Sequence, residues 1–183
     1  MVLNNLKIGF YFLNYEKTWS KKVLLNKAIS WFCAPFKAKF NGKWRDIPSH
    51  CELIFSDKDG VLKMISADCF GGGVRIKNFK PKSEKQWVLV PLEWLRGAGF
   101  SGDLGAAEKA ELESAIKSAL GKKYDFGGLF YFFTGLTIFE SRKKWFCSEL
   151  ITHFLQSVNF CENLTPKKTS PARLFESLKN GIC

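Results

Sequence analysis

Two short segments carry the residue types that nucleophilic catalysis requires. The first is SHCEL (residues 49–53), which begins an apolar stretch that predicts a strand. Side chains alternate along a strand, so His50 and Glu52 share one face while Cys51 points to the other, toward the expected core. An imidazole with a carboxylate two residues away can act as a general base held by an orienting partner.

The second segment, WFCSEL (residues 145–150), places Cys147 where a helix is expected to begin. Unpaired backbone N–H groups in a first helical turn lower the pKa of a thiol and can also hold a developing oxyanion. The basic run at 142–144 adds positive charge just before it. A cysteine nucleophile activated by a distant histidine is the arrangement of thiol hydrolases, so Cys147 and His50 form the candidate pair.

Two other polar residues near Cys147 are expected to have structural roles. His153 follows Cys147 by six residues, which turns it about 120° around a helix and makes it a poor base for that thiol. It is expected to be a partly buried helix residue. Glu149 also faces away from Cys147 and suits a first turn, where the helix dipole favours a carboxylate.

Two glycine patterns match nucleotide-binding motifs without the context that these need. GAGFSG (97–102) fits GxGxxG, but LEWLR (92–96) separates it from the preceding strand, and the next helix begins only near residue 106. Gly71-Gly-Gly73 lacks the Lys-Ser/Thr of a phosphate loop. We therefore expect a loop at the first position and a turn between strands at the second.

The six cysteines form no metal motif. They contain no CxxC pair and do not combine with the two histidines at zinc-finger spacing. A chain of 183 residues buries enough surface to fold without disulfides or metal, so the thiols are expected to be reduced, as in a cytosol. Cys33, Cys69 and Cys161 are interpreted as small buried hydrophobic residues.

The order of the expected elements predicts an α+β domain. Strands are expected at 7–13, 50–55, 61–67, 73–79 and 86–92. Helices are expected at 18–33 with Thr18 as N-cap, at 106–120, 127–139 and 146–158, and from the Ser170-Pro171 start to residue 179. Strands grouped in the middle and helices toward the ends are typical of a small antiparallel sheet packed against helices.

Length and composition fit one globular domain over residues 1–183. Hydrophobic residues are 46% and charged residues 25% of the chain, which excludes a disordered tail, a collagen-like chain and a coiled coil. The formal net charge is +11, with basic residues concentrated in 1–50 and 75–85. Such a surface favours anionic partners, although a basic face that is merely solvated fits as well.

The start of the chain shows no signal peptide, and no apolar run is long enough to span a bilayer, so a cytoplasmic location is expected. The basic and aromatic loop at 34–49 directly precedes His50 and is expected near the mouth of the site. It would suit a substrate with an anionic group beside an apolar part, such as an acidic peptide or an anionic lipid. The alternative is that its aromatic residues pack inward and its lysines only solubilise the chain.

Together, these motifs resemble the circularly permuted papain-like amidases, the YiiX-like branch of the NlpC superfamily. The matching pieces are SHCELIF, GGVR, KYDFGG around Tyr124, WFCSELI and SPARLFESL, and they cover the chain from about Ile8 to Leu178. In ordinary papain-like enzymes the cysteine helix precedes the histidine strand. Here the histidine strand comes first, as in the permuted branch.

The resemblance implies that Cys147 is the nucleophile, that His50 is the general base and that Tyr124 lines the site. The family's reactions include hydrolysis of peptide or other amide bonds, acyl transfer and thioester chemistry on lipids, and they need no metal or organic cofactor. In many relatives a polar residue on the strand after the histidine strand orients the imidazole. The nearest positions here are Ser66 to Asp68, whereas Glu52 is the chemically stronger candidate for this third role.

The competing interpretation is a binding protein of low catalytic activity that uses its basic face, with interleaved tryptophans, on nucleic acid or on an anionic membrane surface. No RRM, KH, OB or helix-turn-helix signature supports nucleic acid as a partner. The expected partner is therefore a small-molecule, peptide or lipid substrate, and the expected activity is that of a cysteine-dependent hydrolase or acyltransferase.

Overall fold

The computed structural model describes residues 1–13, 20–33, 46–69, 72–80, 86–92, 104–128, 144–181 and 183. Within these residues the chain is an α+β fold built around a five-stranded antiparallel sheet, which confirms the expected class. The strand order is β4-β3-β2-β1-β5. The strands are β1 (Asn4–Tyr11), β2 (His50–Ser56), β3 (Leu62–Asp68), β4 (Gly73–Asn78) and β5 (Trp87–Pro91).

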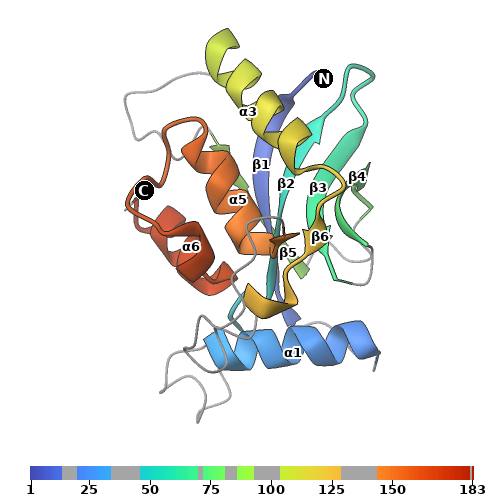
Figure 1. Cartoon of the computed structure of the whole chain (residues 1–183), viewed down its shortest axis with the longest axis vertical. Helices are drawn as coiled ribbons and strands as arrows, with labels where there is room; N and C mark the ends of the chain where they lie inside the picture. Colours follow the sequence, from blue (N-terminus) through green and yellow to red (C-terminus); the bar gives the residue numbers. More distant parts are fainter. Residues whose placement is uncertain are drawn as a thin grey trace.

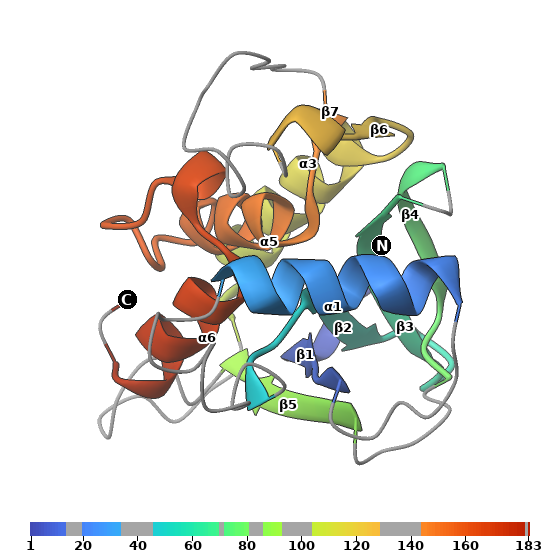
Figure 2. The ribbon, with the colours of Figure 1, turned by 90° about the horizontal axis from the view of Figure 1, so that it is seen from below.

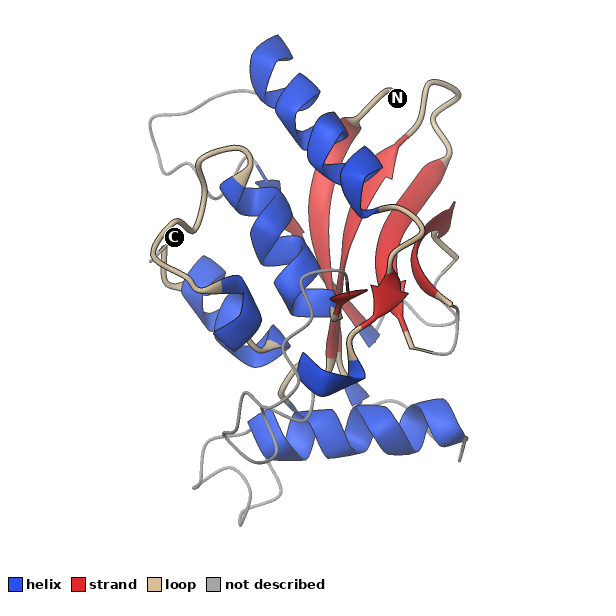
Figure 3. Ribbon diagram, in the orientation of Figure 1, coloured by secondary structure: helices blue, strands red, loops and turns tan. Residues whose placement is uncertain are grey.

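Helices flank the sheet and cross one of its ends (Figure 1). Figure 3 shows α3, α5 and α6 as blue helices beside the red strands. The first helix, α1, runs across the lower end of the strands, as the view from below makes clear (Figure 2). The helices are α1 (Lys21–Cys33), α3 (Ala106–Ala119), α5 (Cys147–Gln156) and α6 (Pro171–Lys179), with a 3-10 turn, η5 (Pro166–Lys168), before α6.

The face of the sheet that meets the helices is apolar and forms the core. Phe10 and Cys51 are register partners on β1 and β2, and both side chains are fully buried. The ring of Phe10 packs edge-on against Phe175 of α6, with 5.0 Å between the ring centroids. Each large apolar side chain buried in this way contributes roughly 1.5–3 kcal/mol to stability. This packing fixes α6 against β1, which is the neighbour of the strand that carries His50.

The opposite face of the sheet carries polar residues. The register places five of them together, namely His50, Glu52, Ser66, Arg75 and Lys77. Phe79, which follows β4, contacts Trp87 of β5 with 5.4 Å between ring centroids, although β4 and β5 are the two edges of the sheet. The sheet is therefore curved, and the polar residues lie on its inner side.

Serine side chains cap the starts of α1 and α6. The Ser170 hydroxyl accepts a hydrogen bond from the Arg173 backbone N–H at 3.1 Å, which confirms the predicted start of α6. The first helix begins later than predicted, because the Ser20 hydroxyl accepts the Val23 N–H at 3.2 Å and α1 starts at Lys21. The expected cap Thr18 lies outside the described residues.

Several other expectations fall on residues that are only partly described. Of the helix expected at 127–139, residues 127 and 128 are described and are helical. The GxGxxG segment at 97–102 and most of the loop at 34–49 lie outside the described residues. At the expected glycine turn, Gly72 and Gly73 have φ angles of 85° and 108° and connect β3 to β4, as predicted.

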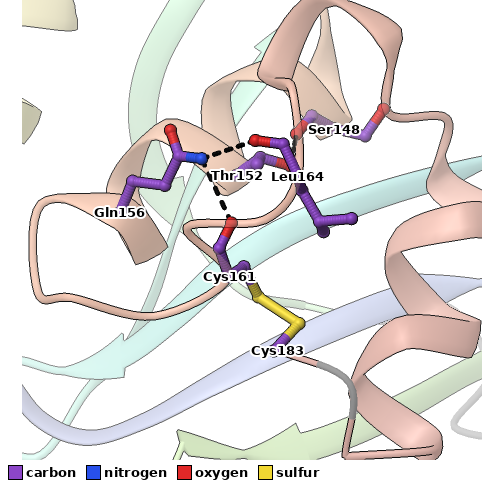
Figure 4. Close-up of a disulfide and its surroundings, with 6 residues drawn as sticks. All are labelled: Ser148, Thr152, Gln156, Cys161, Leu164 and Cys183. Atoms are coloured by element: carbon purple, nitrogen blue, oxygen red, sulfur yellow. Dashed lines mark hydrogen bonds between the residues drawn. A yellow bond between two sulfur atoms is a disulfide. The ribbon is translucent and has the colours of Figure 1, made fainter.

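The expectation of reduced thiols throughout is wrong for Cys161 and Cys183, which form a disulfide (Figure 4). After α5 ends, Asn159 and Cys161 take positive φ angles of 62° and 54°, so the chain reverses and carries the Cys161 sulfur toward the C-terminal residue. The Gln156 amide holds this turn by donating to the carbonyl oxygens of Cys161 at 3.1 Å and Leu164 at 2.6 Å. Cys161 is buried, as predicted, but as half of a cross-link rather than as an apolar thiol.

Cys51, Cys69 and Cys147 are reduced. The side chain of Cys33 lies outside the described set. Among the helices that the structure describes, none has both the length and the apolar composition needed to cross a membrane.

Candidate active site

Cys147 is the first residue of α5 and is almost fully buried. Phe146 before it is extended, and its backbone N–H donates to the Glu149 carboxylate at 3.4 Å, which places Glu149 in the first turn as predicted. The Ser148 hydroxyl donates to the Thr169 carbonyl oxygen at 2.7 Å. These bonds anchor the start of the helix, so the position of the Cys147 sulfur is set by a rigid element rather than by a loop.

A small parallel pair of strands leads into this helix. β6 (Lys123–Tyr124) pairs with β7 (Lys144–Trp145), and β7 ends two residues before Cys147. The backbone before β6 bonds to β4, because the Val74 N–H donates to the Lys122 carbonyl oxygen at 2.9 Å. This close approach needs Gly73, since a Cβ atom there would overlap the same carbonyl oxygen. The glycine turn thus helps to place Tyr124 beside the site.

His50 is the first residue of β2, and its ring contacts both candidates for the orienting role. Its Nε2 lies 3.0 Å from Glu52 Oε1 and 3.4 Å from the Ser66 hydroxyl oxygen. The prediction that His50 and Glu52 share one face of the strand is confirmed. Because Nε2 is engaged by Glu52 and Ser66, Nδ1 is the ring nitrogen that can serve the Cys147 thiol, with which His50 also forms a hydrogen bond.

The electrostatics of the pair favour a thiolate and an imidazolium. Hydrogen bonding from Cys51 and the positive charge of His50 hold the pKa of the Cys147 thiol well below its usual range, although burial opposes this. Burial would lower the pKa of His50, but attraction to Cys147 and Glu52 outweighs it and raises that pKa to about 10. At neutral pH the proton therefore resides on His50 and the negative charge on Cys147.

Cys51 contributes more than packing. Its side chain and its backbone N–H both hydrogen-bond to Cys147. Burial, together with the neighbouring Cys147, raises the pKa of the Cys51 thiol, so Cys51 keeps its proton. The prediction that Cys51 points into the core is confirmed by its complete burial. Its contact with Cys147 was not predicted, because strand alternation does not say which helix covers that face.

Glu52 belongs to a charged network on the inner side of the sheet. Lys77 Nζ lies 4.0 Å from Glu52 Oε1 and 3.8 Å from Asp68 Oδ2, and Arg75 contacts the same Asp68 oxygen at 3.1 Å. Burial would raise the pKa of Glu52, but the hydrogen bond to His50 and the charge of Lys77 lower it. Glu52 is therefore an anion, and it is positioned to stabilise the His50 imidazolium.

Lys77 was not singled out from the sequence, although the signal was present. Arg75 and Lys77 are two residues apart on a strand, so they must share a face. Only the pairing of β4 with β3 shows that this face is the one that carries Ser66 and Glu52. Asp68 is paired with Arg75 and Lys77, whereas Ser66 contacts the imidazole itself.

Tyr124 is buried and lies close enough to Cys147 to interact with its charge. Burial and then the negative charge of Cys147 raise the pKa of its phenol well above the usual value. Its ring packs edge-on against Phe126 with 5.0 Å between centroids, and Phe126 is 59% exposed. An aromatic pair thus extends from the neighbourhood of the thiolate to the surface.

His153 is confirmed as a half-buried helix residue. Its ring stacks on Trp145 with 4.8 Å between centroids, and Lys122 Nζ lies 5.4 Å from the centre of the Trp145 ring. Burial and the charge of Lys122 lower the pKa of His153. This imidazole therefore packs β7 against α5. At neutral pH it is uncharged, whereas the His50 imidazole is charged.

The fold and this geometry define a thiolate–imidazolium–carboxylate cluster on an α+β fold, in which the thiolate and the carboxylate are buried and the imidazole is partly exposed. The described part of the chain holds no cluster of three His, Cys, Asp or Glu side chains that could bind a metal ion. Comparisons with protein-family models, with curated proteins and with solved structures found no match to this chain.

Proposed function

We propose that this protein is a cysteine-dependent hydrolase or acyltransferase that acts on an amide or ester bond through a covalent acyl-enzyme. One observation carries the proposal: Cys147 opens a buried helix and is hydrogen-bonded to His50, whose Nε2 is held by Glu52 at 3.0 Å. A nucleophile, a base and an orienting carboxylate in one line are what acyl transfer by a thiol requires.

The reaction would proceed in two halves. The Cys147 thiolate attacks the carbonyl carbon, and the N–H groups of the first turn of α5 stabilise the oxyanion. The His50 imidazolium gives its proton to the leaving amine or alcohol. His50 then takes a proton from water or from an acceptor nucleophile, which attacks the thioester and releases the acyl group. Glu52 stabilises the imidazolium each time it forms.

The same geometry supports the permuted papain-like architecture as part of the proposal. The strand with His50 precedes the helix with Cys147 in the chain, and that helix packs on the strand through Cys51. In this scheme Tyr124 lines the site, no metal or organic cofactor takes part, and residues 1–183 act as one domain. The Cys161–Cys183 disulfide favours an oxidising compartment over the expected cytoplasm, because cytosolic reductants keep such pairs reduced.

The test is to trap the acyl-enzyme. The full chain is mixed with a panel of activated esters and amides that carry neutral or anionic groups, quenched in acid and mapped by mass spectrometry. An acyl adduct on Cys147 that is absent from Cys147→Ala, and retained in Cys69→Ala as the matched control, would support the proposal. If no substrate acylates Cys147 and Cys147→Ala still shows salt-sensitive binding to nucleic acid or anionic vesicles, the binding-protein alternative is favoured.

A further inference from the structure

Two reduced cysteines meet at the candidate site. Cys51 on β2 and Cys147 on α5 are both buried, with 0% and 1% of their surface exposed. The Cys51 side chain and its backbone N–H both hydrogen-bond to Cys147, so the two sulfurs are neighbours across the strand–helix interface. The proposed acyl transfer uses the Cys147 thiolate, the imidazole and the carboxylate, and a second thiol has no role in it.

Neighbouring sulfurs of unequal acidity are the starting point for disulfide chemistry. The charged neighbour His50 favours a thiolate at Cys147, whereas Cys51 keeps its proton. A thiolate is the form that reacts with peroxides, and the sulfenic acid so formed condenses with an adjacent thiol. Forming a disulfide requires the sulfurs to close from hydrogen-bonding distance to about 2.05 Å.

We infer that Cys147 is a peroxide-sensitive thiol and that Cys51 resolves its oxidised form by closing a Cys51–Cys147 disulfide. In the first step Cys147 sulfur attacks one peroxide oxygen, the O–O bond breaks, and the departing hydroxide takes the proton of the His50 imidazolium to become water. In the second step neutral His50 removes the Cys51 proton, the Cys51 sulfur attacks the Cys147 sulfenic sulfur, and hydroxide leaves with that proton as a second water. Peroxide is reduced by two electrons, and the sulfur pair is oxidised by two.

The consequence is reversible protection of the nucleophile. The disulfide removes the thiolate from reaction and keeps Cys147 from reaching the sulfinic state, and a dithiol reductant restores both thiols by exchange. The reaction needs a reactive thiolate but not a hydrolase, so its outcome is independent of the function proposed above. Cys161 and Cys183 are already joined to each other, and they take no part in it.

The experiment treats the full chain with increasing hydrogen peroxide, blocks residual thiols in acid and maps non-reduced peptides by mass spectrometry. A peptide cross-linked between Cys51 and Cys147 should appear, and it should disappear after treatment with dithiothreitol. In Cys51→Ala the cross-link should be lost, and Cys147 should be trapped by dimedone as sulfenic acid and then accumulate as sulfinic acid. Cys69→Ala, the matched control, should retain the cross-link.

The inference is overturned if, in the protein without substitutions, Cys147 is oxidised to sulfinic acid and no cross-linked peptide forms. It is also overturned if Cys147 forms a disulfide with Cys69 instead of Cys51. The first of these results needs no variant, so a folding defect in Cys51→Ala cannot mask it. Cys51→Ser, which replaces the sulfur by a smaller hydroxyl oxygen and keeps a hydrogen-bond donor but cannot form a disulfide, provides a second comparison. Failure to find any substrate would count against the proposed hydrolase while leaving this cross-link testable.

Discussion

Replacing Glu52 by Gln should lower the pKa of His50, because it removes the negative charge that faces the imidazolium on the side away from Cys147. Glu52 Oε1 is 3.0 Å from His50 Nε2, and the Glu52 side chain is only 2% exposed, so solvent screens the charge weakly. A hydrogen bond to a charged group contributes about 1.5–3 kcal/mol. That energy corresponds to roughly 1–2 pKa units.

The raised pKa of His50 determines in which direction its pH dependence should change in the variant. In the native protein the pKa of His50 is raised to about 10, so its imidazolium persists from neutral pH up to that value and is lost above it. In Glu52→Gln the pKa should fall to roughly 8–9, and the proton should be lost at correspondingly lower pH. The general acid would then be depleted at a lower pH, and the alkaline limb of any pH–rate profile should move with it.

Nuclear magnetic resonance of protein labelled with ¹⁵N-histidine measures this directly, because His50 and His153 are the two histidines of the chain. His153 serves as the internal reference, since burial and Lys122 place its pKa below 6.5 and it lies apart from Glu52 in the fold. Ser66→Ala is the matched control: it removes a contact to the same nitrogen at 3.4 Å but no charge, so the pKa should shift less. A native His50 that titrates near 6.5, or a pKa unchanged in Glu52→Gln, would refute the reasoning.

Three further predictions concern the thiols and the glycine turn. Cys147 should be the most reactive thiol toward limiting iodoacetamide at neutral pH, and dominant labelling of another cysteine in mass-spectrometric mapping would remove the thiolate assignment. The double variant Cys161→Ser/Cys183→Ser should unfold at lower urea concentration, because opening a cross-link with a sequence separation of 22 costs roughly 3 kcal/mol; an unchanged midpoint would contradict this. Gly73→Ala should lose about 1–3 kcal/mol of stability and slow the alkylation of Cys147, because φ is 108° and the added Cβ overlaps the backbone before β6. Gly72→Ala, where φ is 85° but the space is open, should lose less, and equal losses in the two variants would argue against the close approach.

Strand alternation and helix capping, which depend on a few neighbouring residues, predicted much of the fold and the pairing of His50 with Glu52. Alternation along a strand was enough to bring His50 and Glu52 to one face, and the structure finds them in contact. The Ser170-Pro171 start of α6 followed from capping chemistry within four residues. The first helix shows the limit of the same rule, since Thr18 and Ser20 are both residue types that cap helices, and the structure begins α1 after Ser20.

Contacts between distant segments were the ones that sequence patterns missed. Cys51 was predicted to be buried, but not to touch Cys147. Cys161 was predicted to be buried, but not to be joined to Cys183. In each case residue type and spacing describe the local environment, and the partner depends on how the helices pack against the sheet.

The sequence by itself determined the order of the five strands of the main sheet and of the helices α1, α3, α5 and α6, but not the short pair β6 and β7. It also determined the shared face of His50 and Glu52 and the placement of Cys147 at a helix start, because periodicity and capping act over a few residues. Only the tertiary structure decided that Lys77 faces Glu52, that Ser66 reaches the same imidazole nitrogen as Glu52, and that the Cys51 thiol lies against Cys147. These pairings depend on strand register and on the seating of α5 over β2. Both are set by the combined burial of many apolar side chains, which no short motif encodes.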